Sequence, residues 1–134
     1  MLKGQLAFEH FYLYICIMEK CKLEKARLTQ QMLSGLVEKI NELTSGNVSH
    51  QVASLRSITI NINDVMIDDL IASCEEEDTE LKLLLEKVGR NIRGVDNILQ
   101  ELTPMTVDNG KLHLSAWVRF YADALNKALA KYEV

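Results

Sequence analysis

The sequence predicts an all-α protein, an antiparallel bundle of three long helices with one or two short helices, in a single domain spanning residues 1–134. Between residues 79 and 102, apolar residues recur without interruption at alternating steps of four and three, the spacing of a heptad seam. The seam consists of Leu81, Leu85, Val88, Ile92, Val95, Leu99 and Leu102. Composition agrees with this fold, because 48% of the residues are apolar whereas Pro occurs once and Gly six times. Such a chain can fill a core and has little material for loops.

Residues 5–44 are predicted to form one long helix, continuous through the charged stretch 19–27, because no Gly, Pro or Asn interrupts that stretch. Apolar stripes mark both halves, with Phe8, Phe11, Ile15 and Met18 in the first and Met32, Leu33, Leu36, Val37, Ile40 and Leu43 in the second. The aromatic density near the start exceeds what one narrow stripe needs. This part of the helix is therefore expected either at the centre of the bundle or partly buried against another chain.

Residues 44–47 read as a turn, after which Ser49 is expected to cap a shorter helix carrying Val52 and Leu55. Residues 57–63 then alternate isoleucine with polar residues, a pattern that suggests a strand. Because no other segment offers that strand a partner, an extended connection or an irregular helix end is the better interpretation. Asn61 or Asn63 is expected to cap the next helix, which carries apolar residues as far as Ile71.

The seam helix is expected to begin at Asp78 or Thr79 and to lie inside the bundle rather than form an intermolecular zipper, because other long helices of the chain carry compatible stripes. Gly89 and Gly94 each weaken it by roughly 1 kcal/mol relative to Ala. Both glycines lie beside the seam. They are expected to permit the close approach of another backbone, and the side that they share with two arginines is the candidate for an outward-facing surface.

The last helix is expected to begin at Asn109 or Ser115, after Pro104 has ended the seam helix. Its stripe consists of Leu114, Val118, Tyr121, Leu125, Ala128 and Tyr132, widened by Trp117, Phe120 and Leu129.

Several classes of function lack their usual motifs. The three histidines lie far apart, no Glu or Asp precedes a His by three residues, and the acidic stretch 61–80 lacks the glycine and closing glutamate of an EF-hand. Nucleophile elbows and phosphate-binding glycine loops are also missing. The sequence therefore favours a protein that is not an enzyme and that has no metal, cofactor or small-molecule substrate.

The three cysteines are an odd number without a CxxC pair, which is typical of reduced thiols in a cytoplasmic protein. The apolar run at residues 6–18 has about 13 residues, fewer than the ~20 that span a bilayer, and no membrane association is expected.

The leading hypothesis is a protein-interaction module, such as an adaptor, a chaperone, an inhibitor or an assembly subunit of a larger complex. It would bind a protein partner, or a second copy of itself, by burying apolar helix faces. Because aromatic residues carry much of the energy of interfaces, the candidate anchors are Phe8, Phe11, Tyr12, Tyr14 and Trp117.

The alternative is a nucleic-acid-binding protein or a small subunit of a nucleoprotein complex. Residues 44–57 resemble the recognition half of a helix-turn-helix, and residues 20–27 form a basic helix segment. The candidate contacts are Lys20, Lys22, Lys25, Arg27, Arg56, Arg90 and Arg93. A net charge of −4 does not favour this alternative, because affinity for nucleic acid comes largely from clustered Lys and Arg.

Overall fold

The fold is an all-α bundle, seen here in a computed structural model that describes the backbone of residues 2–75 and 78–131 and the side chains of residues 22–75 and 78–131. The elements in chain order are α1 (Leu2–Asn41), α2 (Val48–Asn61), the π-helix η1 (Ile62–Ile67), α3 (Asp68–Ser73), α4 (Thr79–Glu101) and α5 (Val107–Ala130). The predicted class is confirmed, with three long helices of 40, 23 and 24 residues and shorter helices between them.

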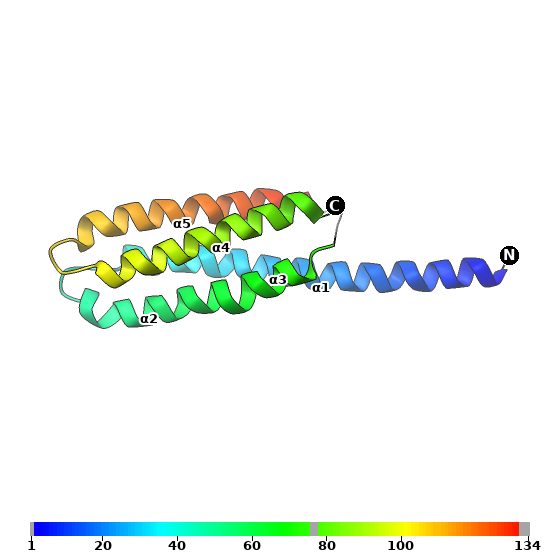
Figure 1. Ribbon diagram of the computed structural model, residues 1–134, viewed down its shortest axis with the longest axis horizontal. Helices are drawn as coiled ribbons and strands as arrows, with labels where there is room; N and C mark the ends of the chain where they lie inside the picture. Colours follow the sequence, from blue (N-terminus) through cyan, green and yellow to red (C-terminus); the bar gives the residue numbers. More distant parts are fainter. Residues whose placement is uncertain (1, 76–77, 132–134) are drawn as a thin grey trace.

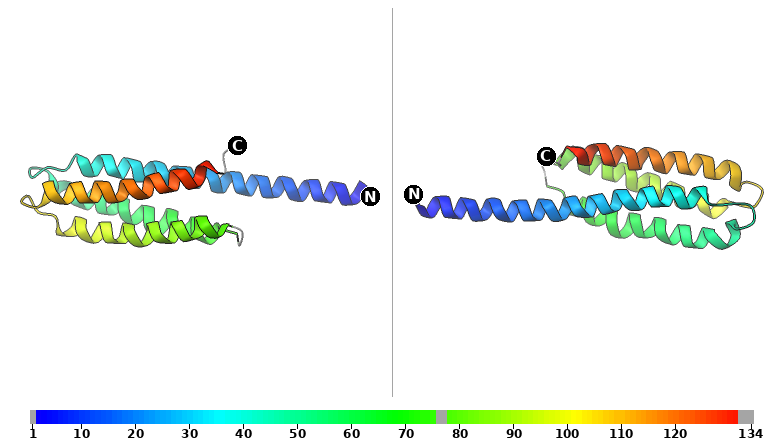
Figure 2. Two further views of the ribbon diagram at one scale, coloured as in Figure 1. Left: turned by 90° about the horizontal axis from the view of Figure 1, so that it is seen from above. Right: turned by 180° about the vertical axis from the view of Figure 1, so that it is seen from behind.

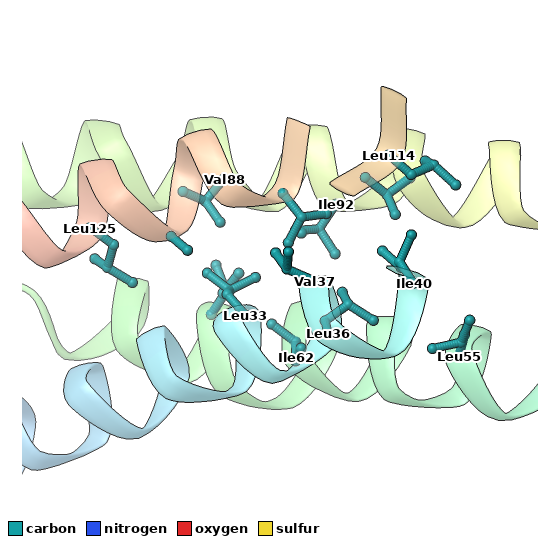
Figure 3. Packing of buried hydrophobic residues seen from close by; sticks show 14 of the residues in the cluster. Leu33, Leu36, Val37, Ile40, Leu55, Ile62, Val88, Ile92, Leu114 and Leu125 are labelled. Carbon is teal, nitrogen blue, oxygen red and sulfur yellow. The ribbon is translucent and has the colours of Figure 1, made fainter. Parts of the chain in front are cut away.

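The helices lie side by side as antiparallel rods (Figure 1). The second half of α1, the run α2–η1–α3, α4 and α5 enclose one continuous apolar core. Figure 3 shows side chains from these rods meeting at its centre, among them the fully buried Leu36, Ile62, Ile92 and Leu125. Since every rod contributes an apolar stripe, burial of these stripes supplies the main driving force for the fold.

Residues 48–73 form one uninterrupted helical rod, so the expected extended connection at 57–63 is wrong, as is a new helix capped by Asn61 or Asn63. The buried positions Leu55, Thr59 and Ile62 follow helical steps of four and three. Packing of this face against the core overrides the alternating isoleucine pattern, and Ile60 is left exposed.

The irregularity that the sequence suggested in this region is a π-helical turn. The step of five residues from the buried Ile62 to the buried Ile67 matches the i→i+5 hydrogen bonding of such a turn. The extra residue also brings Asn63 into the interior, where its side chain is 4% exposed.

Two helices begin earlier than predicted. The N-cap residue of α2 is Asn47 rather than Ser49, because the Asn47 side chain closes the turn: its Oδ1 accepts from the Thr44 N–H at 2.7 Å and its Nδ2 donates to the Glu42 carbonyl at 3.0 Å. Helix α5 begins at Val107, before the expected Asn109 or Ser115. Val107 is fully buried, so core packing includes this first turn in the helix.

Helix α1 covers Leu2–Asn41, shifted by three residues from the predicted range 5–44. The predicted continuity of α1 and the predicted start of α4 are confirmed. Helix α1 is continuous through the charged stretch 19–27, and α4 begins at Thr79 with Asp78 as its N-cap residue. The six seam residues from Leu81 to Leu99 are buried inside the bundle, as predicted, and Leu102 is half-buried. The expectation that Phe120 widens the buried stripe of α5 is wrong, because this side chain is 66% exposed.

Gly89 and Gly94 both permit close packing within the chain. A Cβ on Gly89 would lie 3.0 Å from Asn63 Oδ1 and 3.5 Å from Ile67 Cγ2, so the glycine admits the π-helical rod. A Cβ on Gly94 would lie 2.7 Å from Cη2 of Trp117, so this glycine makes room for the indole ring. Both glycines are closely approached as predicted, but by side chains rather than by another backbone.

The suggestion that this side of α4 forms an outward-facing surface holds for Arg90 and Arg93, which are exposed. It is wrong for Gly89, which is buried, and for Gly94, which lies under Trp117. The physical reason is that a face this close to the seam is covered by neighbouring rods.

Candidate protein-interaction surface

Helix α1 leaves the bundle near residue 22. The first core residue on it is Ala26, which is 1% exposed. Two ion pairs lie just outside: Lys22 pairs with Asp78 at the start of α4, and Lys25 Nζ lies 2.9 Å from Asp69 Oδ2 of α3. Before these contacts the helix runs on alone, with no other described element alongside it (Figures 1 and 2). We call residues 2–21 the α1 extension.

The α1 extension is long and unusually apolar. At 1.5 Å per residue its 20 residues span about 30 Å. Between residues 6 and 18 every residue except Glu9 and His10 is apolar. Four predicted anchors, Phe8, Phe11, Tyr12 and Tyr14, belong to it. Their backbone is helical and stands clear of the bundle, while their side chains lie outside the described residues.

The fifth predicted anchor, Trp117, lies on the bundle and packs within the chain. Its indole N–H donates to Asn91 Oδ1 at 2.9 Å, and its ring covers Gly94. The side chain is half-buried against the core. The structure therefore separates the five anchors into four on the α1 extension and one that joins α5 to α4.

Other exposed apolar residues on the described bundle are scattered over several rods. They are Leu28, Ile60, Val65, Leu83, Met105, Leu112 and Phe120. Phe120 stacks edge-on with its neighbour Tyr121, with ring centroids 5.1 Å apart. Single exposed apolar residues are normal on protein surfaces, so none of these marks an interface by itself.

The candidate nucleic-acid contacts are spread over different parts of the molecule. Lys22 and Lys25 pair with carboxylates, and Arg27 Nη1 donates to Asn126 Oδ1 at 2.7 Å. Arg90 and Arg93 are exposed on α4, whereas the side chain of Lys20 lies outside the described residues.

The proposed helix-turn-helix geometry is not formed. The helices of that motif cross at about 90–120°, whereas α2 runs back along α1 as its antiparallel neighbour (Figure 1). Arg56, the only cation of the proposed recognition helix, is engaged by Asp96 of α4, with Nε 3.0 Å from Oδ1. Residues 44–57 resemble a recognition half because they combine a turn with a helix whose first residues are polar. The connections between helices of a bundle have the same features.

One buried polar residue was not predicted from the sequence. Asn63 donates from Nδ2 to Asp64 Oδ1 at 3.2 Å, while its Oδ1 is buried beside Gly89 without a hydrogen-bond partner. The signal in the sequence was an asparagine within a run of isoleucines.

The described chain offers little for catalysis or metal binding. No three His, Cys, Asp or Glu residues among the described positions come together as a metal site would require. Cys74 is a free thiol near the start of α4. Burial raises the pKa of this thiol above its ordinary value, only partly opposed by the nearby Lys22, and a protonated thiol is a poor nucleophile.

None of the described helices combines the length and apolarity needed to cross a bilayer. No known protein family, curated protein or solved structure matches the chain. The features of the described chain that bear on function are the geometry and composition of the α1 extension.

Proposed function

We propose that the protein is a non-enzymatic interaction module that binds protein through the α1 extension, as an adaptor, chaperone, inhibitor or subunit of a larger complex. The observation that carries the proposal is the placement of residues 2–21 as a helix beyond the bundle, combined with the apolar run at 6–18.

The apolar surface of a helix with this composition needs to be buried against other helices. Helices that are apolar on every side occur where they are buried, and most helical stability comes from packing rather than from intrinsic propensity. Aromatic and β-branched residues are also weaker helix formers than Ala or Leu. Because no described part of the chain packs beside residues 2–21, the cover is expected to come from another molecule.

The bundle presents the α1 extension on a rigid base. The second half of the same helix is fixed in the core by fully buried residues such as Leu33, Leu36 and Ile40. Rigid presentation lowers the entropy lost on binding, so a continuous helix is a better binding element than a flexible tail. We therefore assign the recognition role to the α1 extension and the supporting role to the bundle.

We further propose a cytoplasmic location, without cofactor. The free thiol of Cys74 is compatible with a reducing compartment. The nucleic-acid alternative has less support, because Lys22, Lys25 and Arg56 have carboxylate partners within the chain.

Photo-crosslinking in the native cell tests the proposal. A photoreactive amino acid replaces Phe11 on the α1 extension or, as the control, Met105, which is 95% exposed on the turn before α5. The expected result is a discrete protein adduct from position 11 that position 105 does not give. Adducts confined to lipid, or equal labelling from both positions, would overturn the proposal.

A further inference from the structure

We propose that the occupant of the α1 extension is a second copy of this chain, joined by an antiparallel pairing of the two extensions. This inference rests on the proposed function and specifies its partner. The result is a two-fold dimer in which the two bundles lie at opposite ends of a central helix pair.

The apolar stripe of the α1 extension continues the core-facing stripe of α1. Within the bundle this stripe follows steps of three and four through Ala26, Thr29, Leu33, Leu36, Ile40 and Leu43. The same steps taken toward the N-terminus pass Lys22, where the bundle ends, and then reach Met18, Ile15, Phe11 and Phe8. The face that is covered by the chain's own helices thus returns to apolar residues as soon as those helices stop.

The spacing of the stripe is symmetric. A two-fold interface uses the same patch on both copies, so the patch must be self-complementary. The stripe Phe8, Phe11, Ile15 and Met18 has steps of three, four and three, which read the same in either direction. Antiparallel pairing about residue 13 places position 8 level with position 18 and position 11 level with position 15.

The direction of the pairing follows from what already covers α1. The stripe continues the face of α1 that α5 and the rod α2–η1–α3 cover. In a parallel pair the partner helix would run along this face into the space that those rods occupy. In an antiparallel pair the partner helix approaches from the opposite end, and the two helix dipoles also oppose each other favourably.

The area of the proposed pairing is also adequate. Phe8 and Phe11 bury roughly 150–250 Å² each, and Ile15 and Met18 roughly 60–120 Å² each, so the stripe supplies about 420–740 Å² per copy. Two copies bury about 800–1,500 Å², which reaches into the range of stable protein interfaces, about 1,200–2,000 Å². A monomer rarely leaves a contiguous apolar patch of this size uncovered.

The test uses the full chain in sedimentation equilibrium. The expected wild-type mass is twice that of the chain at about 100 μM, and the double variant Phe11→Glu/Ile15→Glu is expected to raise the dimer dissociation constant by at least roughly 100-fold, because it buries unpaired charge. The matched control is Phe120→Glu, an exposed position on α5, which leaves the dimer intact. Circular dichroism checks that both variants retain the bundle.

Orientation is tested by a spin label at Glu24→Cys, after Cys16, Cys21 and Cys74 have been replaced by Ser. The antiparallel pair places the two labels about 33 Å apart, whereas a parallel pair places them about 10 Å apart. The short distance would overturn the proposed arrangement.

The two proposals fail separately. A wild-type monomer that still gives a specific protein adduct from position 11 would refute the dimer and leave the proposed function standing. A monomer without such an adduct would refute both. Dimerisation that survives the double variant would also refute the pairing proposed here.

Discussion

The two halves of α1 belong to one continuous helix and differ in how their surfaces are divided. The half inside the bundle, from residue 22 onward, buries one stripe and exposes polar residues such as Glu24, Gln31, Ser34, Glu38 and Lys39. The α1 extension has no comparable polar face between residues 6 and 18. A helix divided into two faces exposes mainly polar residues once its apolar side is covered by the bundle, whereas the α1 extension exposes apolar residues until another molecule packs against it.

In the proposed function this difference gives one helix two roles, in the bundle core and in contact with a second molecule. The boundary is marked by charge: the stretch 19–27 is mostly charged, and Lys22 and Lys25 pair with Asp78 and Asp69 at the bundle's end. Apolar stripes before and after this boundary are therefore expected to be covered by different molecules.

The largest difference between the halves is expected from truncating their apolar residues. Leu36→Ala removes a core side chain that is 1% exposed, and it should lower the free energy of unfolding by about 2–5 kcal/mol. Ile15→Ala, measured by urea denaturation in dilute solution where copies are separate, should change it by less than about 0.5 kcal/mol. Equal losses would mean that the extension contributes to the bundle's own core.

The next largest effects on the stability of the bundle are expected from substituting Gly35 and Gly89. Gly35→Ala on α1 meets nothing within 4 Å, so it should stabilise by up to about 1 kcal/mol through helix propensity. Gly89→Ala places its methyl 3.0 Å from Asn63 Oδ1, and the crowded core should make it destabilising by about 1–3 kcal/mol despite the same propensity gain. Thermal unfolding of both variants measures the contrast. Stabilisation by both would show that η1 and α4 have room to separate.

A smaller effect is expected from the ion pairs that brace the bundle. The Arg56–Asp96 side chains are 34% and 17% exposed, whereas those of Lys131–Glu80 are 70% and 89% exposed. Arg56→Ala should therefore cost about 1 kcal/mol and Lys131→Ala less than about 0.5 kcal/mol, since solvent screens the second pair. A low-salt gel-shift assay accompanies the measurement. A shift that Arg56→Ala abolishes would favour the nucleic-acid alternative.

The smallest effect on the bundle is expected from deleting residues 1–21. Because no described element packs beside this segment, the remaining chain should unfold with a free energy within about 0.5 kcal/mol of the dilute full chain. It should also lose self-association. Denaturant titration and sedimentation together measure both properties, and a truncated chain that fails to fold would contradict the division of α1 into two roles.

Much of the fold follows from the sequence because periodic apolar residues specify helices directly. The seam of α4 and the continuity of α1 needed only the spacing of Leu, Ile and Val and the absence of Gly and Pro. The π-turn could not be predicted, since it depends on which of Ile62, Asn63 and Ile67 find room against α4. That choice is made by tertiary packing rather than by local preference.

The candidate surface was predicted only in part. The aromatic density at Phe8, Phe11, Tyr12 and Tyr14 marked this segment as unusual, but its placement beyond the bundle depends on where the other rods end. Trp117 could not be separated from this group by sequence, because its hydrogen bond to Asn91 and its contact with Gly94 come from another helix.

Hydrogen exchange of the backbone amides along α1 tests the central claim most directly. Amides of residues 26–41 should be protected at every protein concentration, because the chain's own rods cover them. Amides of residues 6–18 should be protected at high concentration and exchange progressively faster on dilution, as the second copy dissociates. Protection at 6–18 that does not change with concentration, or its absence at every concentration, would contradict the claim that a second copy covers this half of the helix.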